Sequence, residues 1–340
     1  MSASPDDQSD AHLWQQTRIN LAARALGADV LATSDDFFAE KDNLLLSQEP
    51  VFLPEKYTAY GKWMDGWESR RRRSGDHDWV VVRLVTSGLV EAVEVDTRHF
   101  KGNAPGAVQL EYMDSDVDPD EQSEWQPLTD RVQVQVQVQA DYRNLLSFDQ
   151  PIKASHIRLK IFPDGGVARF RVYGTIPFNT PFRLTGEPVD LASLMTGARS
   201  VACSDSFFSP MQNLLMPGRG SDMHDGWETK RRRGGGNDWM IVKLATAGTI
   251  SRVEVDTLHF KGNYPDSCTL EGCYFIGELP DDSVHWQTIL PVQKLHAHRN
   301  HPFMSQLENN TTAYTHVRLS IYPDGGVSRL RLVGYPEGEQ

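Results

Sequence analysis

The stretch Val93-Glu-Val-Asp-Thr-Arg-His-Phe-Lys-Gly-Asn103 occurs a second time, at residues 253–263, with a single change. The segment Asp65-Gly-Trp-Glu-Ser-Arg-Arg-Arg-Arg73 also returns, at residues 225–233, and the offset is 160 residues in both cases. A unit of this length is too long for a solenoid, whose repeats have about 20–50 residues. The chain is therefore expected to consist of a duplicated domain.

The two copies differ in length at one place. Ser34-Asp-Asp-Phe-Phe38 returns as Ser204-Asp-Ser-Phe-Phe208 after 170 residues, so the first copy has ten extra residues between Leu45 and Trp63. Prolines and a glycine cluster at the junction of the copies, where a linker is expected. The predicted segments are an N-terminal tail at 1–17, a first repeat at 18–178, a linker at 179–188 and a second repeat at 189–336.

The composition is that of a globular protein with enough apolar residues for two cores. The chain has 340 residues, with 34 Lys and Arg against 46 Asp and Glu, and 39% of its residues are hydrophobic. This excludes intrinsic disorder and small disulfide-stapled scaffolds. The N-terminus is polar and acidic and no long apolar run occurs, so we expect a cytoplasmic protein that does not span a membrane. An odd set of three cysteines fits a reducing compartment: Cys203, Cys268 and Cys273.

Short strands dominate the pattern of each repeat. In the first repeat, β-branched and aromatic runs separated by Gly, Asp, Asn and Pro predict strands at 79–85, 89–96, 108–113, 132–139, 156–162 and 168–174. Only residues 21–26 and 191–196, which follow the capping candidates Asn20 and Asp190, are predicted to form short helical turns. The predicted fold class is all-β, with two tandem β-sandwich (jelly-roll) domains.

Turn sequences indicate which loops meet. Thr86-Ser-Gly88 is predicted to be a hairpin turn between its flanking strands, which would bring segment 65–73 beside His99 and Lys101. Pro163-Asp-Gly-Gly166 is predicted to be a second hairpin turn. It lies at the same end of the domain if residues near Trp125 form one more short strand, as an eight-stranded jelly roll requires.

Charged residues are dense at this end of the first repeat and recur in the second. Arg guanidinium groups bind carboxylates and urea-like carbonyls, Asp and Glu accept from planar N–H groups, and His or Lys transfers protons near neutral pH. The set therefore suits a small, anionic, amide-rich ligand. The alternative is that these side chains only form surface ion pairs, each worth about 0–1 kcal/mol.

Three weaker signals favour structural interpretations. The basic runs at 70–73 and 230–233 occur in a chain of net charge -12, so no nucleic-acid partner is expected. His296-Ala-His-Arg-Asn-His301 is better explained as a strand end with solvated histidines than as a metal site. Val132-Gln-Val-Gln-Val-Gln-Val-Gln139 has a strict period of two and predicts a strand, which at a sheet edge would provide an oligomer contact.

At this point the repeated motifs resemble one family. The chain is similar to allantoicase in segments that recur 160 residues later: Gly66-Trp-Glu-Ser-Arg-Arg-Arg-Arg73, Asp78-Trp79, Glu94-Val-Asp-Thr-Arg-His-Phe-Lys-Gly-Asn103 and Pro163-Asp-Gly-Gly166. The resemblance covers roughly residues 18–335. It implies two galactose-binding-like jelly rolls, a homo-oligomer, often a hexamer, and hydrolysis of allantoate to ureidoglycolate and urea in purine catabolism.

The resemblance and the charged residues together give candidate roles. The catalytic candidates are His99 or His259 as the acid that protonates departing urea, with Glu68, Asp96, Glu228 and Asp256 as carboxylates that guide water or take a proton. Carboxylate anchoring is expected from Arg72, Arg73 and Lys101. The full set of substrate-binding candidates is Asp65, Trp67, Arg72, Arg73, Lys101, Asn103, Asp225, Trp227, Arg232, Arg233, Lys261 and Asn263.

No cofactor is indicated by the sequence, although a divalent metal is compatible with the chemistry. Which of the two repeats performs the reaction stays open. The alternative function is a non-catalytic jelly roll that binds carbohydrate or another small ligand, because the fold alone does not separate binding from catalysis.

Overall fold

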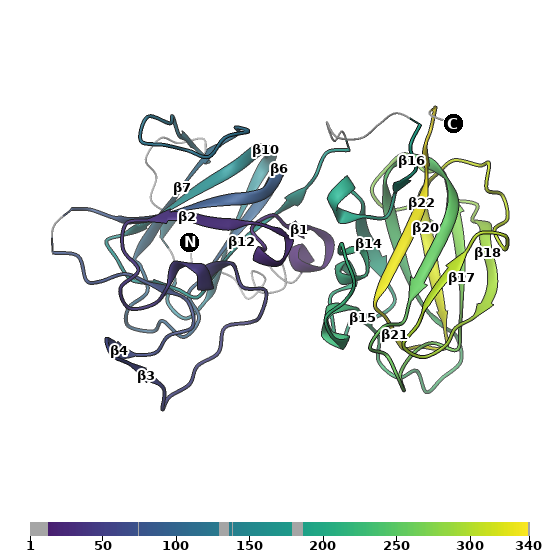
Figure 1. The fold of residues 1–340 in the computed structure, drawn as a ribbon, viewed down its shortest axis with the longest axis horizontal. Helices are drawn as coiled ribbons and strands as arrows, with labels where there is room; N and C mark the ends of the chain where they lie inside the picture. Colours follow the sequence, from purple (N-terminus) through teal and green to yellow (C-terminus); the bar gives the residue numbers. More distant parts are fainter. Residues whose placement is uncertain (1–12, 74, 129–135, 138, 179–185, 339–340) are drawn as a thin grey trace. The chain divides into compact units, whose positions relative to one another are not determined.

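The computed structural model describes residues 13–73, 75–128, 136–137, 139–178 and 186–338. The chain divides into two compact units, Ile19–Thr175 and Ile176–Gln340, and Gln15–Arg18 groups with the second. Both units are built from antiparallel strands with short 3-10 helices (Figure 1). The predicted all-β class is confirmed. No helix among the described residues is long and apolar enough to cross a membrane.

The first unit has one large sheet system and two small ladders. Its main strands follow the order β1-β12-β6-β10-β7-β8, with β2 also paired to β6 and β9 to β7. Their bounds are β1 Ile19–Asn20, β2 Asp29–Thr33, β6 Asp78–Asp96, β7 Ala107–Met113, β8 Gln126–Pro127, β9 Val136–Gln137, β10 Arg143–Phe162 and β12 Arg169–Thr175. The small ladders pair β3 Tyr57–Thr58 with β4 Gly61–Lys62 and β5 Trp67–Glu68 with β11 Gly166–Val167.

The hairpin predicted at residues 86–88 is wrong, because β6 continues through this segment as a single 19-residue strand. The equally long β10 pairs with both of its halves, while β2 pairs with Val80 to Arg83 and β12 with Leu89 to Asp96. Gly88 is needed for packing rather than for a turn, since a Cβ there would lie 2.8 Å from Leu21 Cδ1. One strand therefore belongs to both layers of the sandwich.

The turn at Pro163-Asp-Gly-Gly166 is not a hairpin either, because β10 and β12 do not pair with each other. It connects the two layers, and Gly166 and Val167 then pair with Glu68 and Trp67. A Cβ on Gly166 would lie 2.0 Å from the Phe100 ring, so only glycine fits at this crossing. The additional short strand expected near Trp125 is present as β8.

The second unit repeats this plan with one strand divided. Its sheet order is β13-β22-β16-β20-β17-β18, with β14 and β19 also paired to β16. The bounds are β13 Val189–Asp190, β14 Arg199–Cys203, β16 Asp238–Asp256, β17 Ser267–Cys273, β18 Gln287–Lys294, β19 Asn300–Phe303, β20 Tyr314–Tyr322 and β22 Arg329–Pro336, with the small ladder β15 Trp227–Glu228 and β21 Gly326–Val327. Two strands, β19 and β20, together pair with β16 as β10 alone pairs with β6.

Both predicted helical turns are present as 3-10 helices, η1 Arg24–Leu26 and η3 Leu194–Thr196. The Asn20 and Asp190 side chains accept hydrogen bonds from backbone N–H groups two residues later, at 3.1 Å in each repeat. The remaining 3-10 helices are η2 Lys41–Leu45, η4 Met211–Leu215 and η5 Met223–Asp225. The strand predicted at 132–139 lies mostly outside the described residues, which include only its β9 part.

Candidate functional site

A pocket of about 470 Å³ opens at the loop end of the first repeat. Its walls come from three segments: the insertion that the second repeat lacks, the β5 strand and the loop after β6. The lining residues are Phe38, Phe52, Tyr60, Gly61, Lys62, Met64, Glu68, His99, Lys101, Gly102 and Asn103. Four residues predicted from the sequence, Glu68, His99, Lys101 and Asn103, are therefore brought together.

Alternation along β5 places Glu68 at the pocket. Trp67 is fully buried and donates its indole N–H to the Asp35 carbonyl at 2.8 Å, so the next side chain points to the other side of the strand. Asn103 Nδ2 donates to Glu68 Oε1 at 2.6 Å. Burial raises the pKa of Glu68, and this hydrogen bond opposes the rise only in part. Glu68 is thus a carboxyl group prepared to take up a proton.

His99 is held in one orientation and one tautomer. Its backbone is left-handed, with φ of 72°, and its N–H donates to Asp141 Oδ1 at 2.7 Å. Ring atom Nε2 lies 3.0 Å from the Pro50 carbonyl, which can only accept, so Nε2 carries the hydrogen. The ring also stacks on Phe52 at a centroid distance of 5.9 Å. Nδ1 is therefore the nitrogen available for proton transfer.

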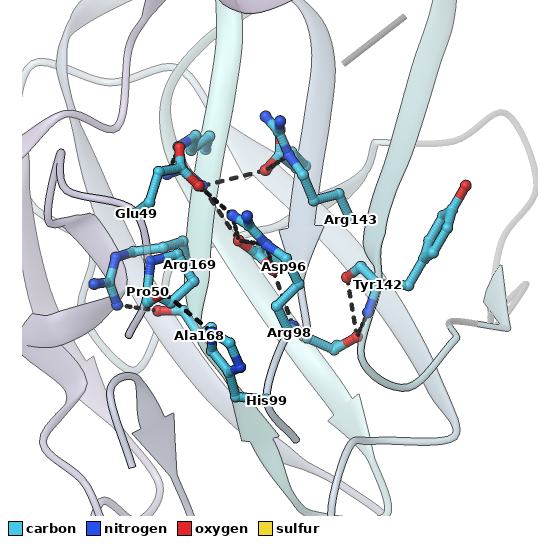
Figure 2. A network of polar contacts seen from close by, with 12 residues as sticks. Glu49, Pro50, Asp96, Arg98, His99, Tyr142, Arg143, Ala168 and Arg169 are labelled. Carbon is cyan, nitrogen blue, oxygen red and sulfur yellow. Dashed lines mark hydrogen bonds and ion pairs between the residues drawn. The ribbon is translucent and has the colours of Figure 1, made fainter. Parts of the chain in front are cut away.

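A buried ion network lies beneath this histidine (Figure 2). Asp96 is completely buried and accepts from Arg98 at 2.6–3.1 Å, and Arg98 also pairs with Glu49, the residue before Pro50. Burial works against ionisation of Glu49, but the charges of Arg171 and Arg98 lower its pKa overall. The network fixes the strap that carries the hydrogen-bond acceptor for His99.

Several predicted residues lie outside the pocket lining. Asp65 accepts from Val51 N–H and from Arg169 Nη2, both at 2.9 Å, and so connects the start of the insertion to the sheet. Trp67 and Asp96 are buried, as described above. Arg72 binds the His77 carbonyl at 2.9 Å and Asp78 at 3.4 Å, while Arg73 is exposed.

The second repeat preserves the floor of this arrangement. Asn263 Nδ2 donates to Glu228 Oε1, and His259 Nε2 lies 2.9 Å from the Gly220 carbonyl. Its ring adopts the same left-handed backbone, with φ of 71°. Asp225 accepts from Ser221 N–H at 2.9 Å, as Asp65 does from Val51. The local hydrogen bonds thus reproduce the first repeat.

The other predicted residues of the second repeat are held in equivalent places. Trp227 is fully buried, with its indole N–H 2.8 Å from the Asp205 carbonyl. Asp256 is buried and pairs with Arg219 at 3.2 Å. Arg232 pairs with Asp238, whereas Arg233 and Lys261 are exposed.

What covers the floor differs between the repeats. In the first repeat, the insertion with the β3–β4 hairpin supplies Phe52, Tyr60 and Lys62, and the hairpin extends beyond the sheets (Figure 1). The second repeat has only residues 221–224 at this place, so Phe208 is 54% exposed whereas its counterpart Phe38 is half-buried.

The histidines near the end of the chain have structural contacts. His298 Nδ1 accepts the backbone N–H of His259 at 2.9 Å, in the place of Asp141 in the first repeat. His301 is buried, accepts from the N–H of His296 and contacts the Val255 carbonyl at 2.9 Å. Among the described residues, no three His, Cys, Asp or Glu side chains are grouped to hold a metal ion.

Sequence reasoning missed the apolar wall and the second ammonium group of the pocket. Phe38, Phe52, Tyr60 and Lys62 were not among the predicted residues, because three of them lie in a segment that is not repeated. The ten-residue difference between the copies was the available signal, since a long loop without a counterpart is often functional.

Comparison with known proteins identifies the family. The model of the allantoicase repeat matches residues 19–177 and 189–337. Probable allantoicase of Photobacterium profundum is 45% identical over 93% of this chain and 96% of its own, and probable allantoicase 2 of Burkholderia pseudomallei is 44% identical over 98% and 99%. The crystal structure of allantoicase from Saccharomyces cerevisiae superposes with a TM-score of 0.80 at 31% identity, covering 98% of this chain and 99% of that one. The chain belongs to the allantoicase family.

Proposed function

We propose that the protein hydrolyses allantoate to ureidoglycolate and urea, and that the pocket of the first repeat is its active site. Family membership supports the reaction, because the named relatives share nearly the full length of the chain. The observation that carries the location is that one pocket contains Glu68, His99, Lys101 and Asn103 beneath an aromatic wall.

The chemistry of the substrate matches that of the pocket. Allantoate is a monoanion whose central carbon carries a carboxylate and two planar ureido groups. Lys62 and Lys101 supply positive charge, and Glu68 and Asn103 supply acceptors and donors for ureido groups. Phe38, a further wall residue, offers a flat apolar surface for a planar group.

The reaction replaces the bond from the central carbon to one ureido nitrogen by a bond to water oxygen. Glu68 takes a proton from the attacking water, since burial gives its carboxylate a raised proton affinity. Protonated His99 donates from Nδ1 to the departing ureido nitrogen, because Nε2–H is bound to the Pro50 carbonyl. Water thus gives its hydroxyl to carbon, the leaving urea gains a proton, and proton transfer between Glu68 and His99 through solvent restores both groups.

The second repeat supports the fold rather than the reaction in this proposal. Its Glu228, His259 and Lys261 are present, but the insertion that completes the pocket in the first repeat is absent there. Binding energy from the aromatic wall and Lys62 is therefore available at only one of the two floors.

The direct test is urea release from allantoate by the purified protein, with ureidoglycolate as a control substrate and with or without prior treatment with a chelator. We expect rapid release from allantoate that the chelator leaves unchanged, since the proposed steps use only side chains and water. Loss of release after chelation would require a metal. No release from folded protein would favour the alternative, a jelly roll that binds a small ligand without chemistry.

Assembly as a homo-oligomer and a cytoplasmic location remain part of the proposal. Sedimentation of the purified protein over a range of concentrations tests the first. A fluorescent fusion followed by fractionation of the producing cells tests the second.

A further inference from the structure

We infer that Lys62, on the β3–β4 hairpin of the first repeat, binds the carboxylate of the substrate and sets the preference of the pocket for an anion. This inference rests on the proposed function. It assigns to a residue of the insertion the role that sequence reasoning gave to Arg72 and Arg73.

The arginines are unsuited to that role by their positions. Arg72 donates through Nε to the His77 carbonyl at 2.9 Å and pairs with Asp78 at 3.4 Å, so its guanidinium is already bound. Its backbone N–H is also used, by Asp164 at 2.7 Å. Neither Arg72 nor Arg73 lines the pocket. The positive charge that an anionic substrate needs must come from other groups.

Two ammonium groups line the pocket, and they differ in their partners. Lys101 Nζ lies 3.5 Å from Asp141 Oδ2, and its side chain is 78% exposed. Among the described residues no Asp or Glu pairs with Lys62, whose Nζ instead lies 4.6 Å from the Phe52 ring centroid and 5.8 Å from that of Tyr57. A cation held only by aromatic faces retains its capacity for a carboxylate.

The position of Lys62 also relates it to the reacting groups. Phe52 contacts both Lys62 Nζ and the His99 ring, which stacks on it at 5.9 Å. A carboxylate at Lys62 would hold the central carbon of the substrate on the side of the pocket where His99 and Glu68 act. The turn at Gly61, whose φ of 138° favours glycine, lets the hairpin reverse directly before Lys62.

The matched variants are Lys62→Gln, which removes the charge, Lys62→Arg, which keeps it, and Lys56→Gln as a control. Lys56 lies in the same insertion and also contacts an aromatic ring, with Nζ 3.7 Å from the Trp63 centroid, but it does not line the pocket. Circular dichroism and thermal melting check that all three variants fold.

The first readout separates binding from chemistry. We expect Lys62→Gln to raise KM for allantoate about 30-fold with kcat within about 3-fold, since a charge-assisted hydrogen bond typically contributes about 1.5–3 kcal/mol. Lys62→Arg should raise KM by less than about 5-fold, and Lys56→Gln should leave both constants within about 2-fold. An unchanged KM in Lys62→Gln would overturn the inference.

The second readout does not depend on turnover. Titration calorimetry compares ureidoacetate, which has the carboxylate and one ureido group, with its neutral methyl ester. In the wild-type protein the anion should bind more tightly than the ester, and Lys62→Gln should abolish the difference by weakening only the anion. Equal weakening of both ligands would make Lys62 a packing residue. Wild-type protein that binds ureidoacetate in this way but releases no urea from allantoate would refute the proposed reaction and leave the role of Lys62 intact.

Discussion

The loop ends of the two repeats share a floor and differ in what stands above it. Both have the Glu–Asn hydrogen bond and a left-handed histidine bound to a backbone carbonyl. Only the first has a 14-residue segment, 51–64, where the second has four residues, 221–224. The shared contacts therefore belong to the folding of the loop, and the segment that is not shared makes the pocket.

The repeats also neutralise one buried carboxylate in different ways. Asp96 is paired with Arg98, whereas the equivalent Asp256 faces Leu258 in the sequence and is paired with Arg219 instead. Arg219 occupies the position of Glu49, directly before the carbonyl that binds the histidine. The requirement for a cation near the buried acid is constant, but the chain position that supplies it is not.

The largest effect is expected from removing the difference between the loops. Replacing residues 51–63 by 221–223 keeps Met64, which packs against Phe100 and Ala168, and removes the aromatic wall and Lys62. We expect kcat/KM for allantoate to fall at least about 10³-fold, because substrate positioning is lost. Steady-state urea release measures the fall, and circular dichroism checks the fold. A folded chimera with more than a tenth of wild-type activity would show that the insertion is dispensable.

Equivalent substitutions on the two floors come next. Glu68→Gln should lower kcat about 10²–10⁴-fold, because the proton acceptor is lost while its shape is kept. Glu228→Gln should leave kcat within about 3-fold. Both variants are compared in the same urea-release assay. Equal losses would place chemistry in both repeats.

The pH profile sharpens the same contrast. Burial raises the pKa of Glu68, and a base works only when deprotonated, so kcat/KM of the wild type should fall as the pH decreases through a value above that of an ordinary glutamate. The residual activity of Glu68→Gln should lack this acid limb, whereas Glu228→Gln should retain it. An acid limb that survives in Glu68→Gln would belong to another group.

Exchange of the buried ion pairs tests the relocated cation. Arg98→Leu alone should lower the free energy of unfolding by about 3 kcal/mol, because Asp96 is completely buried and loses its main partner. Adding Glu49→Arg reproduces the arrangement of the second repeat and should recover about half of the loss. Urea denaturation followed by circular dichroism measures both values. A double variant less stable than Arg98→Leu would mean that the two loops do not accept the same exchange.

The smallest effect concerns an acid that occurs in both repeats. Burial of Glu278 opposes its ionisation, but hydrogen bonds from Arg199 and Lys243 lower its pKa to about 2. A lowered pKa contributes stability above the ordinary value, and that contribution is lost as the pH falls toward 2. Glu278→Gln should therefore cost less than about 1 kcal/mol at pH 7, since the side chain is partly exposed, and the difference from wild type should shrink in acid. Denaturation at pH 7 and pH 3 tests the trend.

The sequence predicted the duplication, the all-β class and the helical turns because these follow from periodicity and from local capping residues. It did not predict strand pairing, because Gly88 has the composition of a turn but is required by contact with Leu21. Segment 65–73 nevertheless lies beside the loop after β6, since β6 passes through both layers. The proximity was predicted correctly from an incorrect hairpin.

Residue types alone were insufficient for the site. The repeated motifs predicted Glu68, His99, Lys101 and Asn103, and these line the pocket. The same argument included Trp67 and Asp96, which are buried, because a residue needed for folding recurs in both copies as readily as one needed for a ligand. Lys62 and the aromatic wall required the three-dimensional path of a segment with no internal counterpart.

The passage of β6 through both layers also affects how the first unit unfolds. Val80 and Val82 in its first half are bonded to different neighbours from Val93 and Val95 in its second half, and all four are fully buried. Neither layer is able to detach while the other keeps its hydrogen bonds along the common strand. Amide protons in the two halves should therefore exchange with solvent through one shared opening, so that the β-sandwich behaves as a single cooperative unit.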